Sequence, residues 1–302
     1  MNESLNEEIA RLKKERNAVV LAHNYTRAEV QDAADYTGDS LELARKATEV
    51  EADVIVFCGV YFMAETAKIL NPAKTVLIPD ASAGCPMADM ITAAELRDFK
   101  ARHPGAKAVC YVNSTAEVKA ECDICVTSGN AEKVMSGFSP SEEILFVPDQ
   151  HLGGHVSSLL SRRYELWPGY CPVHASLTAE LIAAQRLCHP GAVVMVHPES
   201  CKAVRDAADV ALSTGGMCAY AKTSGASEFI VGTEVGILHR LRKENPEKTF
   251  HPLSEDIVCP DMKKSTLANL RDALAEMKHE VTVPEDVAIK AKRAIDAMLA
   301  VK

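Results

Sequence analysis

Three similar apolar runs recur along this chain of 302 residues, and their spacing limits the fold more than any other feature. The runs are AVVLAHNY (18–25), AVCYVNS (108–114) and AVVMVHPE (192–199), and the aligned positions His23, Val112 and His197 lie 89 and 85 residues apart. Each run is rich in β-branched residues and lacks polar alternation, as expected of a parallel strand buried on both faces. The repetition predicts three similar structural units.

Further strand and helix patterns follow each of these runs. Second strands are expected at 53–59, 123–130 and 209–216, third strands at 75–79, 143–149 and 228–234, and helices between them at 40–50, 92–103 and 177–188. Alternating strands and helices indicate parallel sheets with right-handed crossovers. We therefore expect an α/β fold of three small Rossmann-like domains in a pseudo-threefold arrangement. The predicted domains are 1–82 with 262–302, 83–169 and 170–261, with the C-terminal helices packed back on the first.

Three of the ten cysteines are followed directly by proline, at Cys85, Cys171 and Cys259. Proline makes up 14 of the 302 residues, so chance would give fewer than one such pair. The pairs lie 86 and 88 residues apart, which matches the period of the strand repeats. Equivalent loops of the three units would each present one thiol toward a shared centre.

Three convergent thiolates suit a metal ion or an iron–sulfur cluster. Structural zinc sites take four ligands, with cysteines paired at short spacings, which these three lack. A cluster held by three cysteines leaves one iron open, and such an iron is a Lewis acid for substrate oxygens. The alternative is three buried cysteines in duplicated turns. The remaining cysteines are expected in the core, including Cys58, Cys110, Cys188, Cys201 and Cys218, and core or surface positions are favoured for Cys122 and Cys125 over a redox pair or half a zinc site.

Polar residues end the repeated strands, where ligands of parallel sheets bind. His23 and His197 occupy matching strand ends, and His174 follows Cys171 in its loop. These imidazoles are candidate proton carriers. The hydroxyls of Ser40, Ser128 and Thr214 stand near expected helix starts, where free N–H groups favour anions. Tyr25, Asn113 and Glu199 also lie at strand ends, whereas His103, His189 and His279 adjoin helix ends or polar faces and are expected to be structural.

Composition narrows the class of partner. The net charge is −9, which argues against nucleic acid or an anionic membrane as a partner because there is no basic surplus to neutralise phosphates. No apolar run approaches the roughly 18 residues of a membrane span, and the charged N-terminus lacks the apolar core of a signal peptide. A cytoplasmic protein is therefore expected, and its ten cysteines need an explanation other than disulfides, because that compartment keeps thiols reduced. Neither a nucleotide-binding P-loop nor a GxGxxG motif is present.

Together these motifs resemble the quinolinate synthase family, the A proteins of de novo NAD biosynthesis, over essentially the whole chain. The motifs are AHNY with GDS, YVNS, TSGN, GYCPVH, VHPE, STGGM, GTEVGILHRL and the three Cys-Pro pairs. The resemblance implies three domains around a central [4Fe–4S] cluster held by Cys85, Cys171 and Cys259. It also implies condensation of iminoaspartate with dihydroxyacetone phosphate, with loss of phosphate and two waters, to give quinolinate. An aspartate oxidase or dehydrogenase would supply the iminoaspartate.

The same resemblance assigns roles to individual residues. Tyr25 matches the tyrosine implicated in proton transfer, and His174 matches a pocket histidine near the cluster; with His23 and Glu199 they form the expected catalytic group. The iminoaspartate site would comprise His23, Ser40, Tyr111, Val112, Asn113, Ser128, His197, Pro198, Glu199 and Thr214. The C-x-x-C-x-x-C of some longer members is absent around the third ligand, so thiol–disulfide control there is not expected.

Two alternatives remain open from the residues. Three-domain, three-cysteine enzymes also include the reductase that ends the methylerythritol phosphate route and the diphthamide-forming radical enzymes, both of which use the cluster for redox chemistry. A non-catalytic iron- or zinc-binding module is the second alternative. Neither explains the presence of AHNY and VHPE together.

Overall fold

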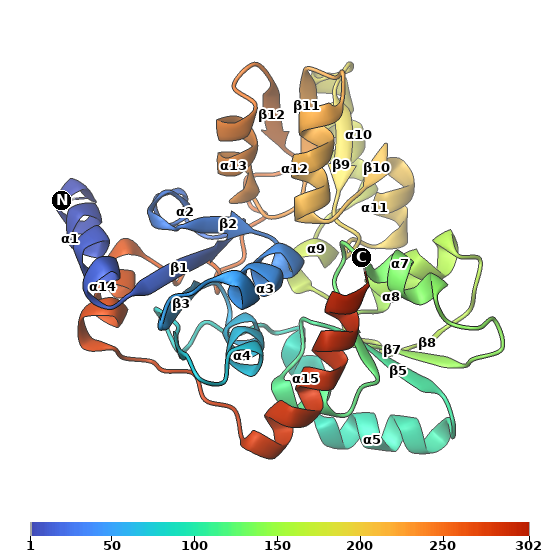
Figure 1. The fold of residues 1–302 in the computed structure, drawn as a ribbon. Helices are drawn as coiled ribbons and strands as arrows, with labels where there is room; N and C mark the ends of the chain where they lie inside the picture. The colour runs from blue at the N-terminus through green and yellow to red at the C-terminus, as the bar shows by residue number, and fades with distance from the viewer. Residues whose placement is uncertain (1, 302) are drawn as a thin grey trace.

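Three sheets of four parallel strands surround a common centre, as the computed structural model shows for residues 2–301, with side chains described for 5–301 (Figure 1). The strand order is the same in each sheet: β2-β1-β3-β4, β6-β5-β7-β8 and β10-β9-β11-β12. The strands are β1 (Ala18–His23), β2 (Tyr36–Gly38), β3 (Val54–Cys58), β4 (Thr75–Leu77), β5 (Lys107–Tyr111), β6 (Ile124–Val126), β7 (Ile144–Val147), β8 (Glu165–Leu166), β9 (Val193–Val196), β10 (Val210–Ala211), β11 (Glu228–Gly232) and β12 (Thr249–Pro252). The predicted fold class of three similar α/β units is confirmed.

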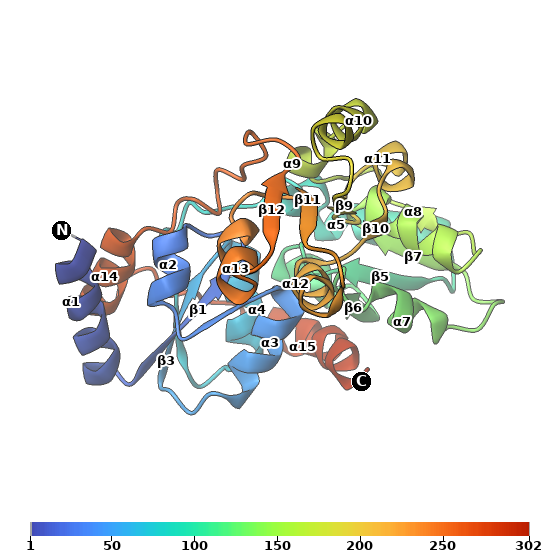
Figure 2. The same ribbon diagram turned by 90° about the horizontal axis from the view of Figure 1, so that it is seen from above.

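Helices connect the strands and flank the sheets (Figures 1 and 2). They are α1 (Asn2–Glu15), α2 (Ala28–Ala33), α3 (Ser40–Glu49), α4 (Tyr61–Leu70), α5 (Ala93–Arg102), α6 (Ala116–Ala120), α7 (Ala131–Ser136), α8 (Gln150–Leu159), α9 (Pro172–Ala175), α10 (Ala179–Cys188), α11 (Lys202–Ala207), α12 (Thr214–Thr223), α13 (Ile237–Glu244), α14 (Leu267–Glu276) and α15 (Glu285–Ala300), with a short 3₁₀ turn at Ala88–Met90. Several begin at a capping side chain, such as Thr92 before α5, which accepts a hydrogen bond from the Glu95 N–H.

An aspartate that recurs in each unit identifies equivalent positions of the three units more precisely than the apolar runs do. In each unit a carboxylate directly before the second strand accepts a hydrogen bond from a backbone N–H of the first strand, 15 residues earlier. The distances are 2.8, 2.8 and 2.7 Å for Asp35, Asp123 and Asp209. The three carboxylates therefore mark equivalent positions in the three sheets.

This alignment corrects the predicted strand register of the first unit. Its second strand is β2, and the run at 53–59, expected to be the second, is the third strand β3. The run at 75–79 likewise contains the fourth strand β4. The error arose because β2 is only three residues long and reads Tyr-Thr-Gly, which gives no apolar signal, whereas β3 is fully buried. With β2 in place, Ser40 becomes the counterpart of Ser128 and Thr214.

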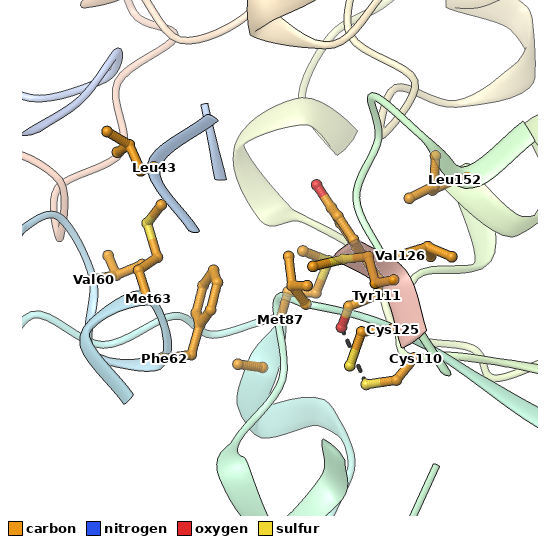
Figure 3. Packing of buried hydrophobic residues seen from close by; sticks show 14 of the residues in the cluster. Leu43, Val60, Phe62, Met63, Met87, Cys110, Tyr111, Cys125, Val126 and Leu152 are labelled. Carbon is orange, nitrogen blue, oxygen red and sulfur yellow. Dashed lines mark hydrogen bonds between the residues drawn. The ribbon is translucent and has the colours of Figure 1, made fainter. Parts of the chain in front are cut away.

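The three units share one buried core. The largest hydrophobic cluster contains residues of all three, such as Leu43 of the first, Val126 of the second and Phe229 of the third. In the close view of Figure 3, Phe62 and Met63 from α4 lie on one side of Met87, and side chains of the second unit lie on the other. Burial of apolar surface across the units holds them in one body, so the space at their centre has fixed walls.

The C-terminal helices bind different units. Helix α14 packs on α1 beside the first sheet, as predicted (Figure 2). Helix α15, expected on the first unit, contacts α6 and β6 of the second as well as α4 of the first. Its buried face, with Ala291, Ala294, Ile295 and Met298, covers the junction. The exact domain boundaries stay a prediction.

The cysteines outside the Cys-Pro pairs follow the predicted pattern with one exception. Cys58, Cys110 and Cys218 are buried and Cys201 is half-buried, but Cys188 at the end of α10 is exposed, contrary to prediction. Its helix turns only a narrow apolar face inward, with Ile182 buried, so the last turn stands in solvent. Among the described residues, no helix combines the length and apolarity needed to cross a membrane.

Candidate active site

A cavity lies where the carboxyl ends of the inner strands of all three sheets meet. Its polar and cysteine lining residues are His23, Tyr25, Asp39, Ser40, Cys85, Tyr111, Asn113, Thr127, Ser128, Cys171, His174, His197, Glu199, Thr214, Glu234 and Cys259. The structure thus brings together all but two of the residues selected from the sequence. Val112 is buried beside Ser40 in an adjoining smaller cavity, and Pro198 is not among the lining residues.

Three hydroxyls enter the cavity from equivalent positions after the second strands. Ser40 and Thr214 are the first residues of α3 and α12, and Ser128 lies just before α7. Side chains cap two of these helices: Asp39 accepts hydrogen bonds from the Leu41 and Glu42 N–H groups of α3 at 3.0 and 2.9 Å, and Ser213 accepts one from the Gly216 N–H of α12. Helix N-termini carry partial positive charge and free N–H groups. The described lining has no lysine or arginine and includes the carboxyl groups of Asp39, Glu199 and Glu234, so the three hydroxyls and the helix starts are its groups best suited to an anion.

The three cysteines of the Cys-Pro pairs also line this cavity, and each follows the fourth strand of a different sheet, β4, β8 or β12. Burial raises the pKa of the Cys85 thiol to about 12 and also raises the pKa values of Cys171 and Cys259. In all three loops, backbone N–H groups two and three positions after the cysteine lower the thiol pKa and so favour the thiolate. The proline between them has no N–H to donate. The loops are thus equivalent in local chemistry as well as in spacing.

This donor set fits a cluster better than a single ion. Within the described residues, the three sulfurs do not all lie within 4.8 Å of one another, as the ligands of one ion would. An iron–sulfur cubane takes each thiolate on a different iron, so its ligands stand farther apart. Backbone N–H groups directed at thiolate sulfurs also suit such a cluster, because they offset its negative charge.

A chain of buried hydrogen bonds crosses the cavity wall and joins Tyr111, Glu199, His174, Thr233 and Tyr25. Tyr111 OH donates to Glu199 Oε1 at 2.5 Å, and His174 Nδ1 lies 2.7 Å from Glu199 Oε2. On its other side, His174 Nε2 lies 2.7 Å from Thr233 Oγ1, which lies 2.5 Å from Tyr25 OH. All five side chains are at most 8% exposed, so water does not compete for these bonds.

When His174 carries one proton, the donors and acceptors along this series of hydrogen bonds are fixed. A carboxylate only accepts, so His174 donates from Nδ1 to Glu199, and its Nε2 then accepts from the Thr233 hydroxyl. Thr233 in turn accepts from Tyr25, because burial, followed by the charge of Glu199, raises the pKa of that phenol and keeps it protonated. Protons can therefore pass between Tyr25 and Glu199 by short steps.

Burial sets the charge state of the remaining imidazoles. It lowers the pKa of both His23 and His197 to about 3, so both are neutral near pH 7. Burial by itself would raise the pKa of Glu199, but His197, His174 and the hydrogen bond from Tyr111 outweigh it and hold this pKa below its ordinary value. Glu199 is thus an ionised carboxylate surrounded by donors. His197 also stacks on His174, with ring centroids 4.8 Å apart.

Two residues that sequence reasoning missed support this arrangement. Thr233 follows β11, and its place at a strand end in the GTEVGILHRL motif was an available signal. Arg205 of α11 donates from Nη1 to the carbonyl oxygens of Pro198 and Ser200, on either side of Glu199. The guanidinium fixes the loop that carries the carboxylate. No local pattern in the sequence distinguishes Arg205, because its partners are backbone atoms.

The fold and this cavity define an α/β enzyme of three repeated units with one active site at their junction. The family model described as Quinolinate synthetase A protein matches residues 7–300. The quinolinate synthase of Dehalococcoides mccartyi strain CBDB1 is 57% identical over 299 residues, 99% of each chain. Those of Methanoregula boonei and Thermus thermophilus are 55% and 53% identical, covering 98% and 99% of this chain and 98% of each relative. The chain belongs to the quinolinate synthetase A protein family.

Proposed function

We propose that this enzyme condenses iminoaspartate with dihydroxyacetone phosphate and releases phosphate and two waters to form quinolinate. The observation that carries the proposal is the junction of three thiols, three helix-start hydroxyls and a buried acid–base chain in one cavity. The name of the family and of its relatives supports the product. The substrates are small, anionic and rich in oxygen atoms, which suits the hydroxyls and helix starts of the lining.

Cys85, Cys171 and Cys259 would hold a [4Fe–4S] cluster with one iron free of protein ligands. When bound, the cluster would supply a Lewis acid that polarises substrate oxygens and assists loss of water. Coordination would offset the raised pKa values of these thiols, since a bound metal deprotonates a buried thiol that is otherwise neutral.

The cavity side chains would bind and orient the two substrates. Ser40, Ser128 and Thr214 offer hydroxyl donors beside three helix starts, which suits carboxylate and phosphate oxygens. The neutral imidazoles of His23 and His197 donate hydrogen bonds without adding charge. The remaining proposed contacts to iminoaspartate come from Tyr111, Val112, Asn113, Pro198 and Glu199. Because most of the lining side chains are buried, water competes little with these contacts.

Proton transfers would run through Tyr25, His174 and Glu199, with His23 beside them. Imine condensation and two dehydrations each need a proton moved to or from oxygen, nitrogen or carbon. Tyr25 is held at one end of the hydrogen-bonded chain and lines the cavity, so it is placed to exchange a proton with substrate. His174 and Glu199 would take up or return that proton through Thr233.

Iminoaspartate hydrolyses in water, so an aspartate oxidase or dehydrogenase has to form it close to the time of use. We infer such an enzyme as the supplier. The ten free cysteines favour the cytoplasm as the location, since that compartment keeps thiols reduced.

Anaerobically purified protein tests the proposal directly. We expect about four iron and four sulfide per chain, as three cysteine ligands and a cubane require. We expect chromatography to detect quinolinate from the two substrates without an electron donor or S-adenosylmethionine. Absence of product with an intact cluster would refute the reaction. A product that forms only with a reductant would favour a redox enzyme instead.

A further inference from the structure

A second group of metal-type ligands lies in the third unit, away from the cavity. His189 caps the end of α10, Glu228 begins β11 and His251 belongs to β12. β11 begins at Glu228 and ends at Gly232, two residues before the cavity residue Glu234, so the group stands at the opposite end of the sheet. Sequence reasoning assigned His189 a structural role and did not connect it with the other two residues.

The ligand atoms of this group converge on one point. His189 Nδ1 and His251 Nε2 lie 3.0 and 2.8 Å from the same atom, Glu228 Oε1. The three donor atoms all lie within 4.8 Å of one another. The two imidazole rings are stacked, with centroids 3.6 Å apart and 22° between their planes. The side chains are 25%, 25% and 35% exposed, so an ion can reach them from solvent.

The second unit provides an internal comparison. Its equivalent helix end, His103 after α5, pairs with Glu143 at 2.6 Å, and Glu143 precedes β7 as Glu228 begins β11. A histidine that fastens a helix end to a strand start is therefore a shared structural device. The counterpart of His251 by strand register is Glu165, so the second imidazole is particular to the third unit. The shared device does not explain it.

We propose that His189, Glu228 and His251 bind a divalent transition-metal ion such as Zn²⁺, with water in the remaining position. Two imidazoles and one carboxylate form a common zinc ligand set. Ligands at about 2.0–2.1 Å in a tetrahedron lie about 3.3 Å from one another. The observed 3.0 and 2.8 Å separations reach this value with shifts of a few tenths of an ångström. The bound ion would tie α10, β11 and β12 together.

The charges of the group are suited to a cation. The hydrogen bond from His251 is the largest influence on Glu228 and, with that from His189, lowers the pKa of its carboxyl group, so the carboxylate is ionised at neutral pH. Two stacked imidazoles would repel each other if both were protonated. A single metal ion bound by neutral His189 Nδ1 and His251 Nε2 takes the place of the two N–H protons, so the two rings need carry no charge.

Titration calorimetry of the anaerobically purified protein with Zn²⁺ tests the proposal. We expect one ion per chain at micromolar affinity, and at least about tenfold weaker binding in His251→Phe and in Glu228→Gln, because loss of a ligand exceeds the 10–100-fold cost of losing an outer-shell partner. The matched control is His103→Ala, which removes the equivalent pair of the second unit and leaves binding unchanged. Thermal unfolding should show a zinc-dependent rise in Tm in the wild type but not in His251→Phe.

X-ray absorption at the zinc edge separates this site from a thiol site. Nitrogen and oxygen ligands give distances of about 2.0–2.2 Å, whereas a cysteine ligand gives about 2.3 Å. Exposed Cys188 adjoins His189, and the cavity thiols are a second possible source of sulfur. A zinc–sulfur distance, equal affinity in His251→Phe and wild type, or no binding up to millimolar zinc would each overturn the proposal.

Discussion

Removal of the Thr233 hydroxyl is the sharpest test of the buried acid–base chain. Thr233 is fully buried, is not a predicted cluster ligand and joins two expected catalytic side chains by hydrogen bonds of 2.7 Å to His174 and 2.5 Å to Tyr25. Thr233→Val replaces the hydroxyl by a methyl group of nearly the same size. The substitution therefore breaks both bonds without opening a cavity.

The hydrogen bonds that Thr233→Val removes determine the expected losses of folding stability and of kcat. His174 Nε2 and Tyr25 OH each lose their hydrogen-bond partner inside the protein, at about 1–3 kcal/mol for each orphaned group, or about 2–6 kcal/mol of folding stability in all. Positioned acid–base groups contribute about 10²–10⁴-fold to rate. Because Tyr25 is cut off from His174 and Glu199, we expect kcat to fall at least about 100-fold. Thr233→Ser keeps the hydroxyl and is expected to retain most activity.

Anaerobic assays of quinolinate formation, with iron analysis of each variant, give the readout. Iron content has to equal that of the wild type, so that a loss of rate is not a loss of cluster. Circular dichroism at the assay temperature shows whether the valine variant remains folded. Wild-type kcat in a folded, iron-loaded Thr233→Val protein would refute the proton path through this residue. Equal losses in the serine and valine variants would refute the role of the hydroxyl.

Three further predictions concern the cluster, the core and pH. Cys171→Ala should lose the cluster and its visible absorption, whereas Cys188→Ala, at an exposed thiol, should keep both; a stable, full cubane in Cys171→Ala contradicts the ligand assignment. Gly153→Ala should destabilise the fold by about 1–3 kcal/mol in denaturant titration, because the new Cβ would lie 2.6 Å from Leu166. The adjacent Gly154→Ala, whose Cβ would have no atom nearer than 3.9 Å, should stabilise it by about 0.5–1 kcal/mol. Equal effects of the two substitutions would contradict the packing. Burial lowers the pKa of His197 to about 3, below the unfolded value of about 6.5, so the unfolded chain binds more protons as the pH falls from 6.5 toward 3. The free energy of unfolding should therefore drop by about 2 kcal/mol at pH 5. An unchanged pH dependence of stability in His197→Asn would contradict this.

The repeat of three α/β units could be predicted from the sequence. Buried parallel strands are continuous apolar runs, so β1, β5 and β9 could be located and their common period recognised. The period of the Cys-Pro pairs agrees with it, and this agreement alone predicts that three thiols meet at one centre. The failure at β2 has the same physical origin, because a three-residue strand of Tyr-Thr-Gly has no apolar pattern to detect. Helix α15 was placed on the first unit alone because an amphipathic helix specifies that it has a partner but not which one.

Some residues of the site could likewise be predicted from the sequence, and others could be found only in the tertiary structure. Strand-end position and motif identified His23, Ser40, Glu199 and their neighbours, because in parallel sheets strand ends converge by topology. Arg205 and the metal-type group at Glu228 were not identified, since their partners are backbone carbonyls or side chains from distant elements. Such contacts leave no periodicity and no short spacing in the chain.

By itself, the sequence determined the repeated α/β architecture and the set of chemical groups at its centre. Apolar periodicity and the positions of cysteine, histidine and hydroxyl residues are properties of the chain alone. Only the tertiary structure decided how those groups are connected. The charge states of His23, His197 and Glu199 depend on burial and on neighbours from other units, and the direction of the chain from Tyr25 through Thr233 to His174 depends on distances between β1, β11 and α9. Those distances are set by packing across the three sheets, which no local stretch of sequence encodes.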